Sequence, residues 1–128
     1  MKRILLAVSA GFVAWSALWV GACTTVPLLA PDAYAPDGSV DGFAVPGFFL
    51  LWSVVLSVLA GFLAMKISRG KPRAVWVLAG LQLTIGLVVE VTGWDNAPAW
   101  YHLAFLAALV PGLLVGAARW QKQQLRRA

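Results

Sequence analysis

Four long apolar stretches, separated by short polar or charged segments, constrain this chain more than any other feature. They cover residues 4–22, 46–65, 74–93 and 101–118. A helix of about 20 residues is roughly 30 Å long, which matches the hydrocarbon core of a bilayer. The whole chain is 61% hydrophobic and only 12% charged, whereas soluble domains contain roughly 25% charged residues. We therefore expect a single all-α domain, residues 1–128, that is integral to a membrane and forms a four-transmembrane-helix bundle.

The charged residues are divided among the connections in a way that predicts the topology. All ten Lys and Arg residues lie in three places: Lys2 and Arg3, residues 66–73, and the tail 119–128. Basic residues are enriched in the cytoplasmic segments of membrane proteins. The pattern therefore predicts an antiparallel bundle with both termini and the 66–73 loop inside the cell, and with loops 24–45 and 94–100 outside.

The same pattern bears on location and partners. It favours a bacterial inner (cytoplasmic) membrane, with anionic lipid headgroups as partners of the basic inner face. The net charge of +5 does not indicate a nucleic-acid-binding surface, because the charges are segregated by topology rather than gathered on one face.

The first apolar stretch has a second interpretation. A short basic start before an apolar run also opens a signal peptide, and Val20-Gly21-Ala22-Cys23 resembles the lipobox of bacterial lipoproteins. That resemblance implies cleavage before Cys23 and lipidation of its thiol. We favour a retained first helix, because the apolar run is long for a cleaved signal. Since Cys23 is the only cysteine, an internal disulfide and paired-cysteine redox chemistry are excluded.

The first outer connection is rich in proline, glycine and aspartate. Its prolines disfavour a helix from residue 24 onward, and Pro36-Asp37-Gly38 predicts a turn. A calcium loop built on Asp37 and Asp41 is the less favoured interpretation, because the ligand spacing and closing Glu of an EF-hand are missing. We expect a solvated external loop.

Small residues recur along the apolar stretches and predict where helices pack closely, since close contact drives association in lipid. The fourth stretch and the second one contain the clearest examples: Ala104, Ala108, Gly112, Gly116, Ser57 and Gly61. A comparable row in the first stretch contains Ala10, Ala14, Ala17 and Gly21. Pro111 removes a backbone donor near the middle of the fourth stretch and predicts a kink there.

Few polar side chains interrupt the apolar stretches. Gln82 lies near the bilayer centre, where a hydrogen bond to Ser57 would satisfy both groups. Glu90, the only acid within such a stretch, lies close to the outer boundary. We favour contact of Glu90 with headgroup water over a role in a proton or cation path or a structural pairing. His102, the only histidine, lies at the same level and can approach Glu90 across the turn.

Together with Asp95 and Asp41, these two residues predict an outward-facing acidic patch with one imidazole. One histidine among scattered carboxylates lacks the closely spaced ligands of a zinc site, so we expect no metal site and no cofactor. We find no catalytic or nucleotide-binding motif. The residues Glu90, His102, Asp95, Asp41 and Gln82 are therefore binding candidates only.

Three classes of function remain open. We favour a non-catalytic accessory or assembly subunit of a larger membrane complex, whose partners are other membrane-protein chains or further copies of itself. One alternative is a small oligomeric transporter or channel for a proton, cation or small solute that uses Glu90 and Gln82. The other is a membrane enzyme that acts on a lipid or quinone, with Glu90 and His102 as acid and base.

Overall fold

The structure, a computed structural model, describes residues 1–128 and contains helices but no strand. Four long helices are joined by short connections: α1 (Lys2–Leu29), α2 (Ala44–Ser68), α3 (Pro72–Thr92) and α4 (Ala99–Arg127). Two 3-10 turns, η1 (Pro31–Ala33) and η2 (Trp94–Asn96), precede α2 and α4. All four long helices are apolar enough to cross a membrane. The expectation of an all-helical chain with four such helices is confirmed.

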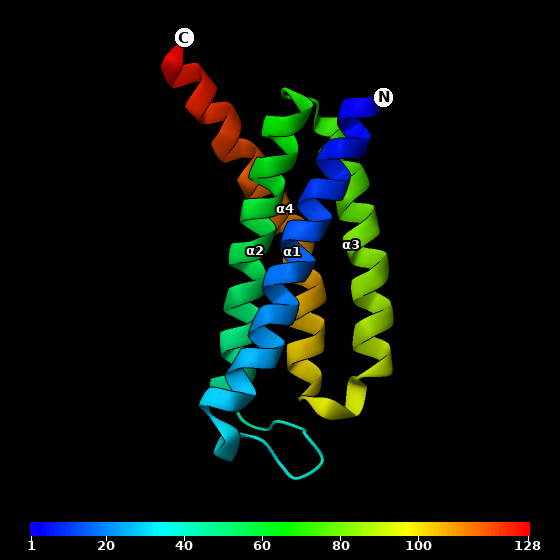
Figure 1. The fold of residues 1–128 in the computed structure, drawn as a ribbon, viewed down its shortest axis with the longest axis vertical. Helices are drawn as coiled ribbons and strands as arrows, with labels where there is room; N and C mark the ends of the chain where they lie inside the picture. Colours follow the sequence, from blue (N-terminus) through cyan, green and yellow to red (C-terminus); the bar gives the residue numbers. More distant parts are fainter.

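Successive helices run in opposite directions. Figure 1 shows both termini and the α2–α3 turn at one end of the bundle, and the α1–α2 and α3–α4 connections at the other. The ten basic residues therefore lie toward one end of the molecule, while Asp32, Asp37, Asp41 and Asp95 lie at the opposite end.

The helices extend beyond the apolar stretches that predicted them. α1 continues past Cys23 to Leu29 with Pro27 inside it, so the prediction of a loop from residue 24 is wrong for this segment. Pro27 removes a single donor in the last turn, and the bond that closes the helix, from Ala30 N–H to the Val26 carbonyl (2.9 Å), still forms. α4 likewise runs through the predicted tail to Arg127, a segment rich in Gln and Arg, which favour helices.

The turn predicted at Pro36-Asp37-Gly38 is confirmed. Gly38 has φ +83°, a conformation that glycine adopts without steric cost, and its N–H donates to the Ala35 carbonyl at 2.8 Å. Asp37 Oδ1 accepts hydrogen bonds from the Ser39 hydroxyl (2.6 Å) and the Ser39 backbone N–H (3.0 Å). These two bonds hold the pKa of the exposed Asp37 carboxyl below its usual value.

α2 and α4 make the closest helix contact in the bundle. A Cβ added at Gly61 would collide with the Leu113 backbone, and one added at Gly116 would collide with the Val58 backbone. A Cβ at Gly112 would lie 2.6 Å from Ser57 Cβ. The structure thus brings together four residues of the predicted small-residue rows, whereas Ala104 and Ala108 are only half-buried.

α1 packs through a different face from the one predicted. Ala7, Val8 and Gly11 are buried, and a Cβ at Gly11 would lie 2.7 Å from Leu78 Cδ2. By contrast, the row Ala10, Ala14, Ala17 and Gly21 turns outward along the helix: Ala17 is exposed, and a Cβ added at Gly21 would have no neighbour within 4 Å. The prediction is wrong because the inward face at this level is formed by the large rings of Trp15 and Trp19, which pack against Phe49 and Phe105.

Pro111 lies inside α4 with its ring exposed. The C-terminal part of α4 leans away from the other helices (Figure 1), as expected for a helix that loses a backbone donor at its middle. Pro111 lines none of the cavities described below.

Candidate functional site

The ends of α3 and α4 form a buried polar site beneath their connecting turn. Glu90 is in the last turn of α3, and His102 is in the first turn of α4. The two residues are 4% and 3% exposed, respectively. The structure therefore brings together the acid and the histidine as predicted. The favoured expectation that Glu90 reaches headgroup water is wrong, because its side chain turns inward toward α4.

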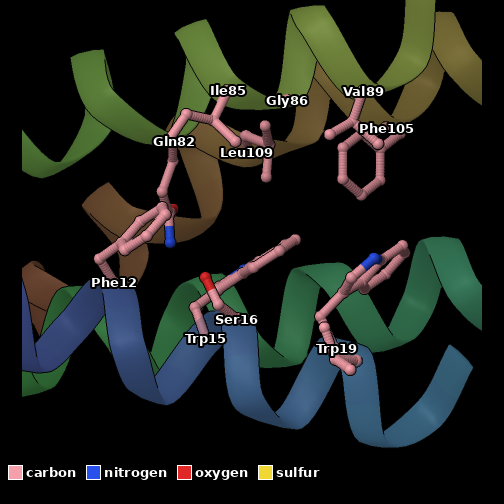
Figure 2. A pocket seen from close by; sticks show the side chains of 11 residues that line it. Phe12, Trp15, Ser16, Trp19, Gln82, Ile85, Gly86, Val89, Phe105 and Leu109 are labelled. Atoms are coloured by element: carbon pink, nitrogen blue, oxygen red, sulfur yellow. The ribbon is translucent and has the colours of Figure 1, made fainter. Parts of the chain in front are cut away.

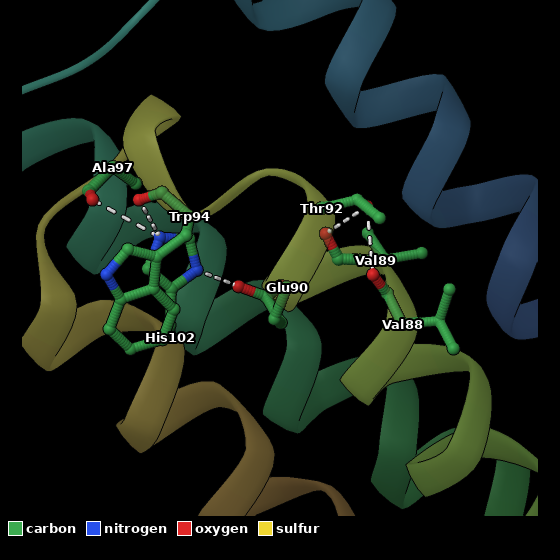
Figure 3. Close-up of polar contacts among 7 residues, drawn as sticks. All are labelled: Val88, Val89, Glu90, Thr92, Trp94, Ala97 and His102. Atoms are coloured by element: carbon green, nitrogen blue, oxygen red, sulfur yellow. Dashed lines mark hydrogen bonds and ion pairs between the residues drawn. The ribbon is translucent and has the colours of Figure 1, made fainter.

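The hydrogen bonds of His102 define how the pair is held (Figure 3). Its Nδ1 contacts Glu90 Oε2. Its Nε2 lies 2.9 Å from the Trp94 carbonyl oxygen and 3.2 Å from that of Ala97. Carbonyl oxygens only accept hydrogen bonds, so Nε2 carries a proton and donates it.

The contact between Nδ1 and Glu90 then requires one further proton, which either partner can hold. The pair is an imidazolium with a carboxylate, or a neutral imidazole with a carboxylic acid. Its net charge is zero in both arrangements. Burial of a single uncompensated charge in an apolar interior would be strongly destabilising. The acid and the base avoid this cost because they are buried together.

Trp94 covers this pair from the side of the turn. Its ring stacks on the His102 ring, with centroids 4.7 Å apart and an interplanar angle of 21°. Nearby, the Thr92 hydroxyl donates to the Val88 and Val89 carbonyls at 2.8 and 3.0 Å. These bonds give two carbonyls in the last turn of α3 a side-chain donor (Figure 3). The pair thus binds α3 to α4 under a closed turn.

The predicted acidic patch does not form. Asp95 and Asp41 are exposed, and the single ion pair in the structure joins His102 to Glu90. No group of three or more His, Cys, Asp and Glu side chains could hold a metal ion; the Asp37–Asp41 loop therefore has no calcium-like cluster either. The prediction placed these residues at the same depth, but Glu90 and His102 point inward while the loop carboxylates point outward.

A second site lies deeper, between α1, α3 and α4. It is a cavity of about 170 Å³ whose walls are mostly apolar (Figure 2). The rings of Trp15 and Trp19 stack with centroids 5.2 Å apart, and Phe105 lies 6.1 and 5.2 Å from them. Along one side, the lining residues are partly exposed on the surface of the molecule: Val20, Ile85 and Val89. The cavity therefore opens sideways between α1 and α3.

Gln82 brings an amide group to this cavity. Its side chain extends from α3 toward α1 (Figure 2). The residue is 4% exposed, and neither Oε1 nor Nε2 has a hydrogen-bond partner in the protein. The predicted bond to Ser57 is wrong, because neither amide atom reaches that side chain. The Ser57 hydroxyl instead accepts a hydrogen bond from Trp15 Nε1 at 3.2 Å.

The aromatic walls of this cavity were not among the residues predicted from the sequence. Phe12, Trp15 and Trp19 follow one another at spacings of three and four residues, which places them on one face of a helix. That spacing was the available signal, and Phe105 of α4 completes the group from a distant part of the chain.

The remaining candidates lie apart from both sites. Cys23 is exposed on α1. At the opposite end of the bundle, a groove between α2 and α4 is lined by basic and aromatic residues that include Lys66, Arg69, Trp120 and Arg127.

Comparisons of the chain with protein-family models, with curated proteins and with solved structures find no significant match.

Proposed function

We propose that this chain is inserted in a bacterial inner membrane as an antiparallel four-helix bundle, and that it is a non-catalytic accessory or assembly subunit of a larger membrane complex. The separation of the basic end from the acidic end supports the orientation (Figure 1). By the bias of basic residues toward the cytoplasm, both termini and the α2–α3 turn face inward. The basic groove near Lys66 and Arg127 then lies at the level of anionic headgroups.

The burial of the Glu90–His102 pair is the observation that carries the choice of function. A transporter or an acid–base enzyme uses such groups in contact with its substrate. Here the polar atoms are engaged with each other and with two backbone carbonyls, and neither residue lines the cavity between α1, α3 and α4. A pair that holds α3 against α4 favours a structural role, and such a role is what we expect of an accessory or assembly subunit.

The outward face of α3 is the surface that we assign to the partner chain. Trp76, Gly80, Thr84 and Val88 follow at every fourth position and are all exposed. Nothing lies within 4 Å of a Cβ added at Gly80. The Thr84 hydroxyl donates to the Gly80 carbonyl at 2.8 Å. At the centre of the row, Gly80 and Thr84 are therefore small residues of the kind that allow close helix contact in lipid.

Extraction of the untagged protein from its own membranes in mild detergent tests this proposal. We expect the native mass to correspond to a stable assembly that contains other chains, and Gly80→Leu to release the protein from it. Val77→Leu is the matched control, because Val77 is exposed on the same helix outside the row. A native mass near 13.7 kDa, or a small multiple of it with no other chain, would contradict the accessory role.

The orientation has its own test. In a Cys23→Ser background, Asp41→Cys should react with a membrane-impermeant maleimide in intact cells, and Lys71→Cys should react only after the cells are opened. The reverse pattern would refute the assigned orientation. The denatured mass of the wild-type chain also reports on Cys23, because cleavage before it with lipidation would change that mass.

A further inference from the structure

We propose that the cavity between α1, α3 and α4 is a binding site for a neutral, lipophilic molecule with a single benzene-sized ring that carries a carbonyl or hydroxyl oxygen. Gln82 supplies its polar contact. The cavity opens beside the partner surface on α3, but it shares no lining residue with that surface, and the inference does not rest on the accessory role.

The size of the cavity sets the size of the ligand. An apolar cavity of about 150 Å³ within a protein accommodates benzene. The present cavity, at about 170 Å³, leaves room for one ring and a small substituent.

The walls select for a planar and uncharged molecule. Trp15, Trp19 and Phe105 pack against one another, with ring centroids 5.2–6.1 Å apart, and form an aromatic wall of the cavity. A ring bound in the cavity can pack on this wall in an offset or edge-to-face arrangement. No lining residue is ionisable. A charged ligand would therefore lose its hydration without gaining a counter-charge.

The amide of Gln82 selects for an oxygen on that ring. Its NH₂ group can donate to a carbonyl or hydroxyl oxygen, and its Oε1 can accept from a hydroxyl. Both atoms are buried without a partner in the protein, an arrangement that is unfavourable. A ligand oxygen that bonds one of these atoms reduces that penalty on binding, whereas a plain hydrocarbon ring leaves it in place.

The opening of the cavity indicates how such a molecule arrives. Val20 of α1 is 57% exposed, and Ile85 and Val89 of α3 are 40% and 52% exposed. In the proposed orientation this side of the bundle faces lipid, so the ligand enters from the membrane rather than from water.

Fluorine NMR of the full-length protein in detergent micelles tests the site with a matched pair of probes, 4-fluorophenol and fluorobenzene. We expect a saturable bound resonance at one ligand per chain, absent from empty micelles. After correction for partition into micelles, 4-fluorophenol should bind about 3- to 10-fold more tightly, the range expected for one net hydrogen bond. Gln82→Met preserves the volume of the side chain, and should abolish this preference while fluorobenzene still binds.

A second pair of variants keeps the test independent of the fate of Gln82→Met. Val20→Trp fills the opening of the cavity and should abolish saturable binding of both probes. Val13→Trp is the control, because Val13 is 62% exposed on the same helix and lies outside the cavity. The proposal is overturned if no saturable resonance appears, if the two tryptophan variants bind alike, or if Gln82→Met retains the preference for the phenol.

Discussion

Replacement of Gly61 by alanine should destabilise the bundle more than a single added methyl group normally does. The new Cβ would lie 2.8 and 2.9 Å from the carbonyl carbon and Cα of Leu113, whereas ordinary contacts are 3.4–4 Å. These are backbone atoms of α4, which cannot rotate away as a side-chain end can. α2 and α4 must therefore separate by about 1 Å, and facing atoms lose a quarter to a half of their dispersion energy at such a gap.

We expect this change to lower the free energy of unfolding by about 2–3 kcal/mol, the upper part of the range for overpacked cores. Unfolding of the purified protein by SDS in mixed micelles, followed by tryptophan fluorescence, measures the effect. Gly80→Ala is the matched control: it adds the same methyl group at a mid-helix position, where the new Cβ has no neighbour within 4 Å. It should stabilise the protein by about 0.5–1 kcal/mol, because alanine favours a helix. Equal stability of the two variants would refute the assigned helix contact.

Three further predictions use the same protein. Glu90→Ala and His102→Ala should each lower the free energy of unfolding by about 1–3 kcal/mol, because each leaves a buried polar group without its partner. The double variant should cost less than the sum, so additive costs would argue against a coupled pair. Gln82→Met should raise the free energy of unfolding by about 1 kcal/mol, because an unpartnered buried amide is removed; a loss of stability would contradict the assigned environment. Ser39→Ala should raise the pKa of Asp37 toward its usual value of 3.8, measured by NMR titration of the carboxyl carbon. Since that pKa is lowered in the folded protein, the contribution of Asp37 to stability is present above 3.8 and is lost as the pH falls through the lowered value. An unchanged titration of Asp37 in the variant would show that the Ser39 hydroxyl has no such effect.

The helices could be predicted from the sequence because hydropathy alone marks an apolar segment of the required length. Their ends could not, since hydropathy marks the part of a helix that suits the bilayer core and not the part that projects beyond it. α1 therefore continues through Pro27, and α4 continues through the polar residues up to Arg127.

The polar sites could likewise be predicted only in part. The proximity of Glu90 and His102 could be predicted, because one short turn joins two helices that run in opposite directions. The direction of Glu90 could not, because the depth of a residue in the bilayer leaves its position around the helix axis undetermined. The same limit explains Gln82 and Ser57, which share a depth while the Ser57 hydroxyl is bound by Trp15.

The position of the Glu90–His102 pair has a consequence for how the chain enters a membrane. The two residues are 12 positions apart and flank a single turn, so α3 and α4 bring an acid and a base to the bilayer as one hairpin. A lone carboxylate at the bilayer centre costs about 2.5–3.5 kcal/mol on the insertion scale, and less near the boundary. In the proposed membrane insertion, pairing lowers that cost, because the acid and the base enter the bilayer together with no net charge. For a chain inserted as proposed, we therefore expect α3 to reach its final environment only when the start of α4 has joined it.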